Sequence, residues 1–224
     1  MNNLVLSPVY KAYDKVIEMC EAIDKNSVYD FLHVLVDDNS GIPPIKITPR
    51  RHCITLRNDP DPERVHKSQH GQCTQIGYDY AMQKCRFWKN AEPLDYVFLI
   101  ESDVIVKEQW DKKMIDLIPT LPENWATLDL QSVDKDGKLT YPCTVAPRKG
   151  YVRADLEHME YADFECTLFN PEVFKSGVKF GDIQSHFDIL WSRKVTELTG
   201  RQHYRTMLVS AMHYTFASRG ELPK

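Results

Sequence analysis

An apolar run that ends in two acids is the part of this sequence whose residue types point most directly to chemistry. Residues 94–100 are predominantly apolar and are typical of a buried strand, and Glu101-Ser102-Asp103 follows them directly. Ligands of open α/β sheets bind beyond the carboxyl ends of the strands, and hard divalent cations prefer carboxylate oxygens. The triplet therefore predicts a site for a metal and a phosphate-bearing ligand, and a polar cap on an ordinary turn is the alternative.

Three further predicted strands also end in polar or ring-bearing residues. These strands are expected at residues 4–6, 31–36 and 207–212. In chain order, their ends carry Pro8 and Tyr10, then Asp37 and Asp38, and finally His213. In a mainly parallel sheet such ends lie along one edge, so we expect these groups to converge with the acidic triplet on one shared site.

Stripes of apolar residues at helical spacing separate the predicted strands. They recur every three or four positions in segments 13–23, 73–84, 110–118 and 187–198. Further strands are expected at residues 125–130 and 163–169, and Asn170-Pro171 is typical of a helix start. Residues 42–70, apart from short strands, and residues 142–161 are expected to be loops. This alternation predicts an α/β fold with a mixed, mostly parallel central sheet flanked by helices.

The length and composition of the chain favour one folded domain. With 224 residues, 42% of them hydrophobic, the chain can bury one sizeable core, so we expect a single domain over residues 1–224. The net charge of -4 provides no basic surface for a nucleic acid. The six cysteines include no C-x-x-C pair, which argues against a zinc site. No stretch reaches the ~18 apolar residues of a membrane span, so we expect no transmembrane segment and a cytoplasmic location.

The motifs also follow one another in a characteristic order. In sequence order they are Ser7-Pro8-Val9-Tyr10, Val36-Asp37-Asp38-Asn39-Ser40, His70-Gly71, Glu101-Ser102-Asp103, the segment 187–193 and His213. This ordered set resembles the nucleotide-sugar-dependent glycosyltransferases of the GT-A fold, especially the inverting family 2. The resemblance covers nearly the whole chain and implies a Rossmann-type sandwich. Glu101 stands where that family has the first Asp of its D-x-D signature.

The resemblance implies a role for each matched residue. The nucleotide would be bound by Pro8, Tyr10, Asp38, His70, Glu101 and Ser102. A divalent cation, Mn²⁺ or Mg²⁺, would be bound by Asp103, Glu101 and His213. The catalytic base would be Asp188, with Asp182 as a rival because the segment lacks the family's usual Glu-Asp pair. An ordinary acid in the first turn of a helix is the alternative for Asp188.

The function implied is that of a metal-dependent, inverting glycosyltransferase of the hexosyltransferase type. It would move a sugar from a nucleotide diphosphate donor, a UDP-sugar, to a hydroxyl of a glycan or another acceptor. Residues 1–103 would form the nucleotide-binding half and residues 104–224 the acceptor-binding half. A non-catalytic nucleotide-sugar-binding module remains open because of Glu101. A sugar-phosphate nucleotidyltransferase is disfavoured because no glycine-rich basic loop follows the first strand.

Overall fold

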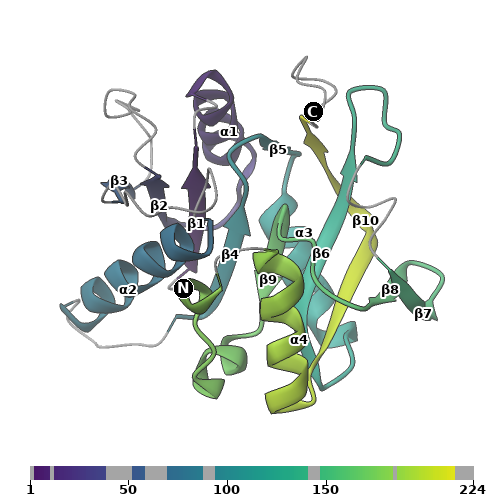
Figure 1. Ribbon diagram of the computed structural model, residues 1–224. Helices are drawn as coiled ribbons and strands as arrows, with labels where there is room; N and C mark the ends of the chain where they lie inside the picture. The colour runs from purple at the N-terminus through teal and green to yellow at the C-terminus, as the bar shows by residue number, and fades with distance from the viewer. Residues whose placement is uncertain are drawn as a thin grey trace, which may run out of the picture.

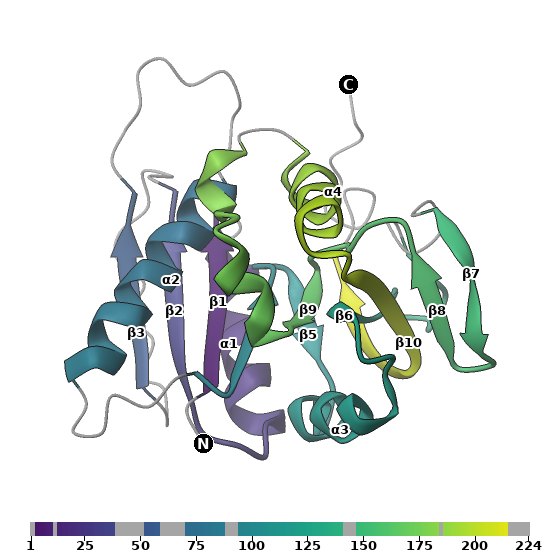
Figure 2. The same ribbon diagram turned by 90° about the horizontal axis from the view of Figure 1, so that it is seen from below.

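A continuous mixed β-sheet forms the centre of the protein (Figure 1). The computed structural model describes residues 3–10, 13–38, 52–58, 70–87, 94–140, 147–183 and 186–214. Within these residues the sheet has ten strands in the order β3-β2-β1-β4-β9-β6-β10-β8-β7, and β5 pairs separately with β10. The edge strands β3 and β7 lie at opposite sides of the molecule (Figure 2). The expected α/β class with a mixed sheet is confirmed.

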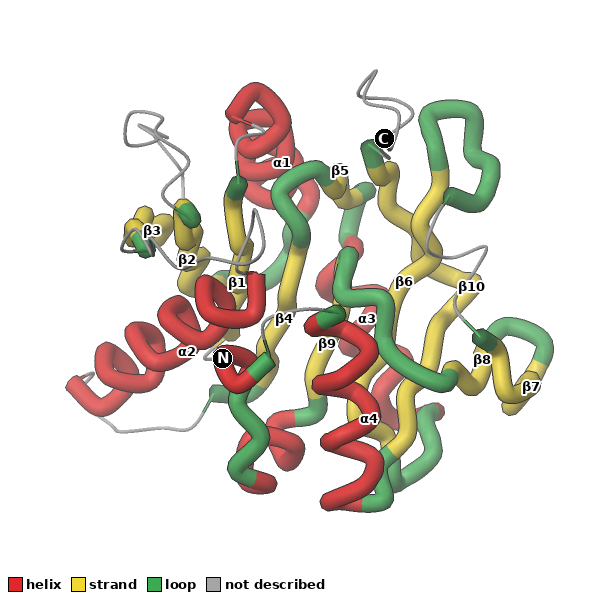
Figure 3. The backbone as a smooth tube through the Cα atoms, viewed as in Figure 1, coloured by secondary structure: helices red, strands yellow, loops and turns green. Residues whose placement is uncertain are grey.

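The elements alternate along the chain in the first half and less regularly in the second. The strands are β1 (Asn3–Val9), β2 (Phe31–Asp37), β3 (His52–Arg57), β4 (Tyr96–Ile100), β5 (Val104–Val106), β6 (Trp125–Val133), β7 (Arg148–Arg153), β8 (Leu156–Met159), β9 (Cys166–Phe169) and β10 (Gln202–His213). The α-helices are α1 (Tyr13–Asn26), α2 (His70–Phe87), α3 (Trp110–Leu117) and α4 (Phe187–Thr199). Short 3₁₀ helices are η1 (Ile118–Thr120), η2 (Pro171–Ser176) and η3 (Phe180–Asp182). The tube in Figure 3 shows how loops connect them.

Helices cover both faces of the sheet, as Figure 2 shows. Strand β1 illustrates why, because successive side chains point to opposite faces. Val5 and Val9 pack in one core with the apolar faces of α1 and α3. Leu4 and Leu6 pack in the other core with α2 and α4. A strand that is apolar on both faces must be covered on both, which produces the three-layer arrangement.

The first half of the sheet is parallel and the second half is mixed. Strand β1 pairs in parallel with β2 and β4, and β2 pairs in parallel with β3. Strand β9 then runs antiparallel to both β4 and β6, whereas β6 and β10 are parallel. The carboxyl ends of β1, β2 and β4 therefore share an edge, while β9 brings its amino end to that edge.

Several predicted boundaries need correction. Residues 148–159 are not loop: β7 and β8 form an antiparallel hairpin on β10. Its outer strand is polar and largely exposed, so it lacks the apolar alternation of a half-buried strand. Strand β1 also continues through Pro8 instead of ending before it. Proline has no backbone N–H, but the pairing of β1 with β4 stops at Leu6, so no hydrogen bond to β4 is lost at Pro8. The predicted helix start at Asn170 is confirmed, because its side chain accepts a hydrogen bond from the backbone N–H of Glu172.

A buried histidine joins α4 to the sheet. His203 of β10 is 1% exposed. Its Nε2 lies 3.0 Å from the carbonyl oxygen of Ser192 in α4, and its Nδ1 lies 2.9 Å from the hydroxyl of Thr127 in β6. The neutral ring can donate through Nε2 and accept through Nδ1. Burial lowers the pKa of His203 to about 4.

This lowered pKa predicts a loss of stability at mildly acidic pH. The unfolded chain takes up a proton at His203 near pH 6.5, whereas the folded chain does so only near pH 4. The contribution of neutral His203 to the free energy of unfolding is therefore complete above pH 6.5 and is lost as the pH falls toward 4. Between about pH 7.5 and pH 5, His203 should lower the free energy of unfolding by about 2 kcal/mol. Buried acids with raised pKa values, Asp163 and Glu165, change the free energy of unfolding in the opposite direction over this range, so the His203 contribution is measured as a difference between two proteins. In urea denaturation, the same drop in pH should cost the wild type about 2 kcal/mol more than it costs His203→Gln. Equal changes in the two proteins would contradict the assignment.

Of the helices in the described ranges, none combines the length and the apolar character needed to cross a membrane.

Candidate metal and nucleotide site

The acidic triplet forms a tight turn between β4 and β5. The backbone N–H of Val104 donates to the carbonyl of Glu101 across this turn at 3.1 Å. The N–H of Glu101 donates to the carbonyl of Glu165 at 2.9 Å, at the start of β9. Strand β5 pairs antiparallel with β10, which sets His213 opposite Val104. These two backbone hydrogen bonds and the β5–β10 pairing therefore hold the triplet and His213 at one place.

Glu101, Asp103 and His213 meet there, as expected from the sequence. One ligand atom from each lies within 4.8 Å of the others. The Nε2 atom of His213 is 3.4 Å from Oδ2 of Asp103, and both side chains are buried while Glu101 is half-buried. Ligand atoms at 2.1–2.6 Å from a cation lie up to roughly 4–5 Å apart, so this set fits one divalent ion. Two carboxylates and one imidazole suit Mn²⁺ or Mg²⁺ better than zinc, which favours nitrogen and sulfur.

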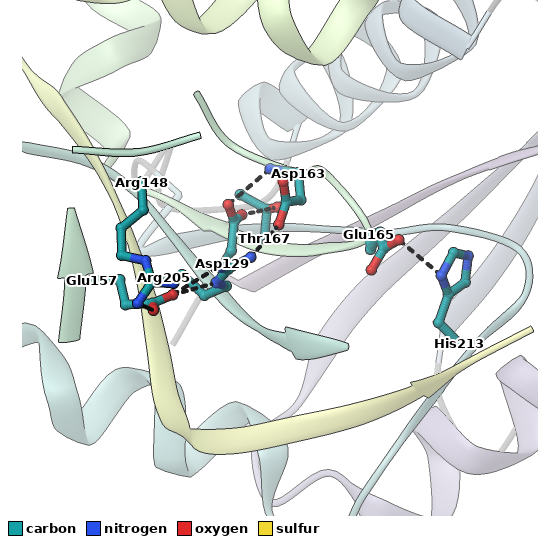
Figure 4. A network of polar contacts seen from close by, with 8 residues as sticks. All are labelled: Asp129, Arg148, Glu157, Asp163, Glu165, Thr167, Arg205 and His213. Carbon is teal, nitrogen blue, oxygen red and sulfur yellow. Dashed lines mark hydrogen bonds and ion pairs between the residues drawn. The ribbon is translucent and has the colours of Figure 1, made fainter. Parts of the chain in front are cut away.

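A second carboxylate contacts His213 from the side opposite Asp103. Oε1 of Glu165 lies 2.8 Å from Nδ1 of His213, and Figure 4 shows the pair. The Glu165 side chain is 4% exposed, and burial raises its pKa to about 7 although His213 and the Ser132 hydroxyl oppose the rise. Sequence reasoning missed this residue. Its signal was an acid within the predicted strand 163–169, whereas Glu101 follows its apolar run.

The start of α2 lies against the acidic turn. Nδ1 of His70 is 3.6 Å from Oε1 of Glu101, so the structure brings this predicted nucleotide-binding residue to the site. Gly71 lets the start of α2 pack closely on the 180–183 segment: a Cβ there would lie 2.6 Å from the carbonyl oxygen of Phe180 and 2.7 Å from that of Ile183. Such contacts are too close for any side chain, so only glycine lets α2 begin here. Ser102 is half-buried in the turn.

Asp188 lies in the first turn of α4 and is within electrostatic reach of the acidic turn. Burial raises the pKa of Asp188, and the negative charge of Glu101 raises it further. The helix begins after His186, whose φ of 48° and ψ of 45° are left-handed, so the chain turns sharply before Asp188. Asp182 ends η3, and its side chain lies outside what the structure describes.

The residues predicted to hold the base lie at the ends of β1 and β2. Pro8 is buried and Tyr10 is half-buried. Asp38 is 0% exposed, and its Oδ1 accepts a hydrogen bond from Nδ2 of Asn58 at 3.1 Å. Contact between this carboxylate and a nucleobase therefore requires a shift of the groups that cover it. Residues 39–51, which include the end of the predicted motif, lie outside the described residues.

Beside this site lies a buried ionic network that the sequence did not predict (Figure 4). Arg205 of β10 donates to Oε2 of Glu157 at 2.7 and 2.8 Å and to Oδ2 of Asp163 at 3.2 Å. Asp129 of β6 accepts from the hydroxyl of Thr167 at 2.5 Å and from the N–H of Asp163 at 2.8 Å. Burial raises the pKa of Asp163 to about 6, against the opposing charge of Arg205. The network joins β6, β8, β9 and β10 behind the site.

Comparisons with known proteins were made for both sequence and structure. The sequence matches no protein-family model and no curated protein. The structure is similar to that of S. aureus TarS 1-349 in complex with UDP-GlcNAc, with a TM-score of 0.62 and 13% identity over 100% of this chain and 62% of that chain. It is also similar to GalNAc-T7 with UDP, GalNAc and Mn²⁺, with a TM-score of 0.62 and 11% identity over 95% of this chain and 44% of that one.

A third similar structure is the mannosyltransferase PcManGT from Pyrobaculum calidifontis in complex with GDP-Man and Mn²⁺. The TM-score is 0.59 and the identity 12%, over 99% of this chain and 57% of that chain. The chain thus spans less than two thirds of the length of each of these structures. At this level of identity the similarity concerns the fold. The chain has the GT-A fold, as the order of its sequence motifs implied.

Proposed function

We propose that this protein is a glycosyltransferase that moves a sugar from a UDP-sugar to a hydroxyl of a glycan or another acceptor. The observation that carries the proposal is the meeting of Glu101, Asp103 and His213 beyond the carboxyl end of β4, in a GT-A fold. The similar structures hold UDP-GlcNAc, UDP with Mn²⁺, or GDP-Man with Mn²⁺, which agrees with a nucleotide-sugar donor.

The metal site supports a metal-dependent reaction. Asp103, Glu101 and His213 would hold Mn²⁺ or Mg²⁺, and their donor atoms suit such an ion. A divalent cation bound there stabilises the negative charge that forms on the diphosphate leaving group. His70, which lies beside Glu101, and Ser102 are proposed to contact the nucleotide.

Asp188 is proposed to act as the general base. The acceptor hydroxyl must lose its proton as it attacks the anomeric carbon, and inversion requires attack on the face opposite the diphosphate. Burial and the nearby charge of Glu101 raise the pKa of Asp188, which makes its carboxylate a stronger proton acceptor than an exposed acid. Asp182, six residues earlier, is the reserve candidate.

We propose that one half of the chain binds the nucleotide and the other half binds the acceptor. Residues 1–103 supply β1, β2 and the acidic turn for the nucleotide. Residues 104–224 supply Asp188 and the β7–β8 hairpin, and we assign the acceptor to this half.

Release of UDP tests the proposal most directly. The protein is incubated with a panel of UDP-sugars, with and without Mn²⁺, and free UDP is measured. UDP release that requires Mn²⁺ is expected. Binding of UDP-sugars without release in the presence of varied acceptors would favour a non-catalytic binding module. Release of pyrophosphate from UTP and a sugar 1-phosphate would favour a nucleotidyltransferase.

Base recognition provides a separate prediction, centred on Asp38. A carboxylate accepts a hydrogen bond from the ring N–H of uracil or thymine, whereas cytosine offers no such ring N–H, so UDP and dTDP should stabilise the protein more than CDP. A hydrogen bond to a charged group contributes about 1.5–3 kcal/mol and a neutral one about 0.5–1.5 kcal/mol, so Asp38→Asn, which keeps an acceptor but loses the charge, should weaken UDP binding roughly five- to tenfold.

The matched control is Asp37→Asn. Asp37 is the preceding residue and is also buried, but its Oδ2 accepts from Nε of Arg57 at 3.1 Å. The Asp37→Asn variant should be stabilised by UDP and CDP in the same order as the wild type. Thermal-shift measurements that rank CDP first in the wild type would contradict the assignment of Asp38.

A further inference from the structure

Glu165 lies beside the proposed metal site but is not one of its three proposed ligands. Its Oε1 is 2.8 Å from Nδ1 of His213, and it is 4% exposed. The other ring nitrogen of His213, Nε2, faces Asp103 at 3.4 Å. His213 thus lies between two carboxylates, one beside each ring nitrogen.

The two carboxylates lie at different distances from the ring nitrogens that they face, and this difference bears on the tautomer of His213. A neutral imidazole carries one N–H and one lone pair. Glu165 lies at hydrogen-bond distance from Nδ1, 2.8 Å, whereas Asp103 lies 3.4 Å from Nε2, which is longer than a usual hydrogen bond, so the N–H is favoured at Nδ1. The lone pair then lies on Nε2, the ring nitrogen that faces Oδ2 of Asp103. That is the tautomer in which Nε2 can bind a cation. Metal-binding histidines generally donate their other N–H to a carboxylate or a carbonyl, which fixes the orientation of the ring.

The backbone holds Glu165 firmly in this position. Its carbonyl oxygen accepts the N–H of Glu101 at 2.9 Å, and the next residue, Cys166, pairs with Ile100 at the end of β4. The β4–β9 pairing therefore sets the distance from Glu165 to the acidic turn, and the β5–β10 pairing brings His213 to the same turn. The ring of His213 thus meets a carboxylate whose backbone is held by the sheet.

We propose that Glu165 is a positioning residue that fixes the Nδ1–H tautomer and the orientation of His213 for binding of the divalent cation. The inference rests on the proposed function, because it assigns Glu165 a role at the same metal site. Glu165 acts through His213 and touches neither donor nor acceptor. Substituting such a supporting residue commonly lowers metal affinity about 10- to 100-fold.

The test measures Mn²⁺ affinity in a double-mutant cycle. Mn²⁺ is titrated into the full chain, with and without UDP, and free Mn²⁺ is followed by its EPR signal. Glu165→Gln should weaken Mn²⁺ binding about 10- to 100-fold in the wild-type background. In the His213→Ala background the same change should have almost no effect, because the ring that Glu165 orients is gone.

A spectroscopic measurement tests the tautomer without a metal. The ¹⁵N shifts of the His213 ring, identified by their loss in His213→Ala, should show Nδ1–H in the wild type near pH 8. In Glu165→Gln the population of the Nε2–H form should rise. A ring that is already Nε2–H in the wild type would overturn the proposal.

Asp129→Asn is the matched control. Asp129 is buried and bonds Thr167, two residues beyond Glu165, so its loss disturbs the same strand without touching His213. It should leave Mn²⁺ affinity within a few-fold of the wild type. An equal loss of affinity in Glu165→Gln and Asp129→Asn, or an equal effect of Glu165→Gln with and without His213, would overturn the positioning role.

The outcomes also separate this inference from the proposed function. Absence of Mn²⁺ binding to the wild type, with and without UDP, would overturn the metal site itself and the positioning role with it. Mn²⁺ binding that needs Asp103 and His213 but is unchanged in Glu165→Gln would overturn only the inference.

Discussion

Asp188→Asn is expected to lower turnover about a hundred- to ten-thousandfold, because loss of a general base typically has an effect of this size. Affinity for UDP should stay close to that of the wild type, since Asp188 is proposed to contact the acceptor hydroxyl and not the diphosphate. Asn keeps the size of the side chain and can still accept a hydrogen bond from the first turn of α4. The measurement is a pair: UDP release at saturating acceptor, and UDP affinity by calorimetry.

Asp182→Asn is the comparison for this prediction. It removes a carboxylate from the same segment, in η3, and should reduce turnover much less. Collapse of turnover in Asp182→Asn with near-normal turnover in Asp188→Asn would transfer the role to Asp182. Near-normal turnover in both variants would remove the base from this segment.

Asp103→Asn is expected to abolish the dependence of UDP binding on Mn²⁺. Asp103 is 1% exposed, and Oδ2 lies 3.4 Å from Nε2 of His213, so it is central to the cluster of ligand atoms. A metal stabilises the developing charge by several kcal/mol, so turnover should fall on the order of a hundredfold or more. Calorimetry of UDP binding with and without Mn²⁺ measures the first effect, and UDP release measures the second.

Asp136→Asn serves as the control for loss of a negative charge. Asp136 lies in the exposed turn after β6, and its removal should change neither UDP affinity nor turnover. Circular dichroism checks that Asp103→Asn is folded, which we expect because Asn preserves the shape of the buried side chain. Unchanged Mn²⁺-dependent affinity for UDP in a folded Asp103→Asn variant would show that the metal assignment is wrong.

Local patterns in the sequence predicted the elements whose faces are clearly apolar or polar. Helix α4 was expected over 187–198 with a cap at Gly200, and it runs to Thr199 with Gly200 at a φ of 70°. Such features depend on neighbours within one turn or on the two faces of one strand, so they are readable from a short window. The polar strand β7 gave no such pattern, because an exposed edge strand needs no apolar face.

The sequence also determined which groups stand at the strand ends: the Glu-Ser-Asp triplet after β4, the acids at the end of β2 and the histidine at the end of β10. Their convergence was expected from parallel strands, and for Glu101 and Asp103 with His213 the structure supplies the contact through an element that was not predicted. Strand β5, only three residues long, pairs with β10 and places His213 opposite Val104.

Only the tertiary structure decided that Glu165 meets His213 and that Arg205 meets Glu157 and Asp163. Glu165 and His213 are far apart in the sequence, and they meet because β9 runs antiparallel to β4 while β5 pairs with β10. The direction and neighbours of a strand depend on which packing buries the most apolar surface over the whole sheet, and no local window contains that information. The sequence therefore established which chemical groups stand at the strand ends, and the pairing of distant strands decided which of those groups touch.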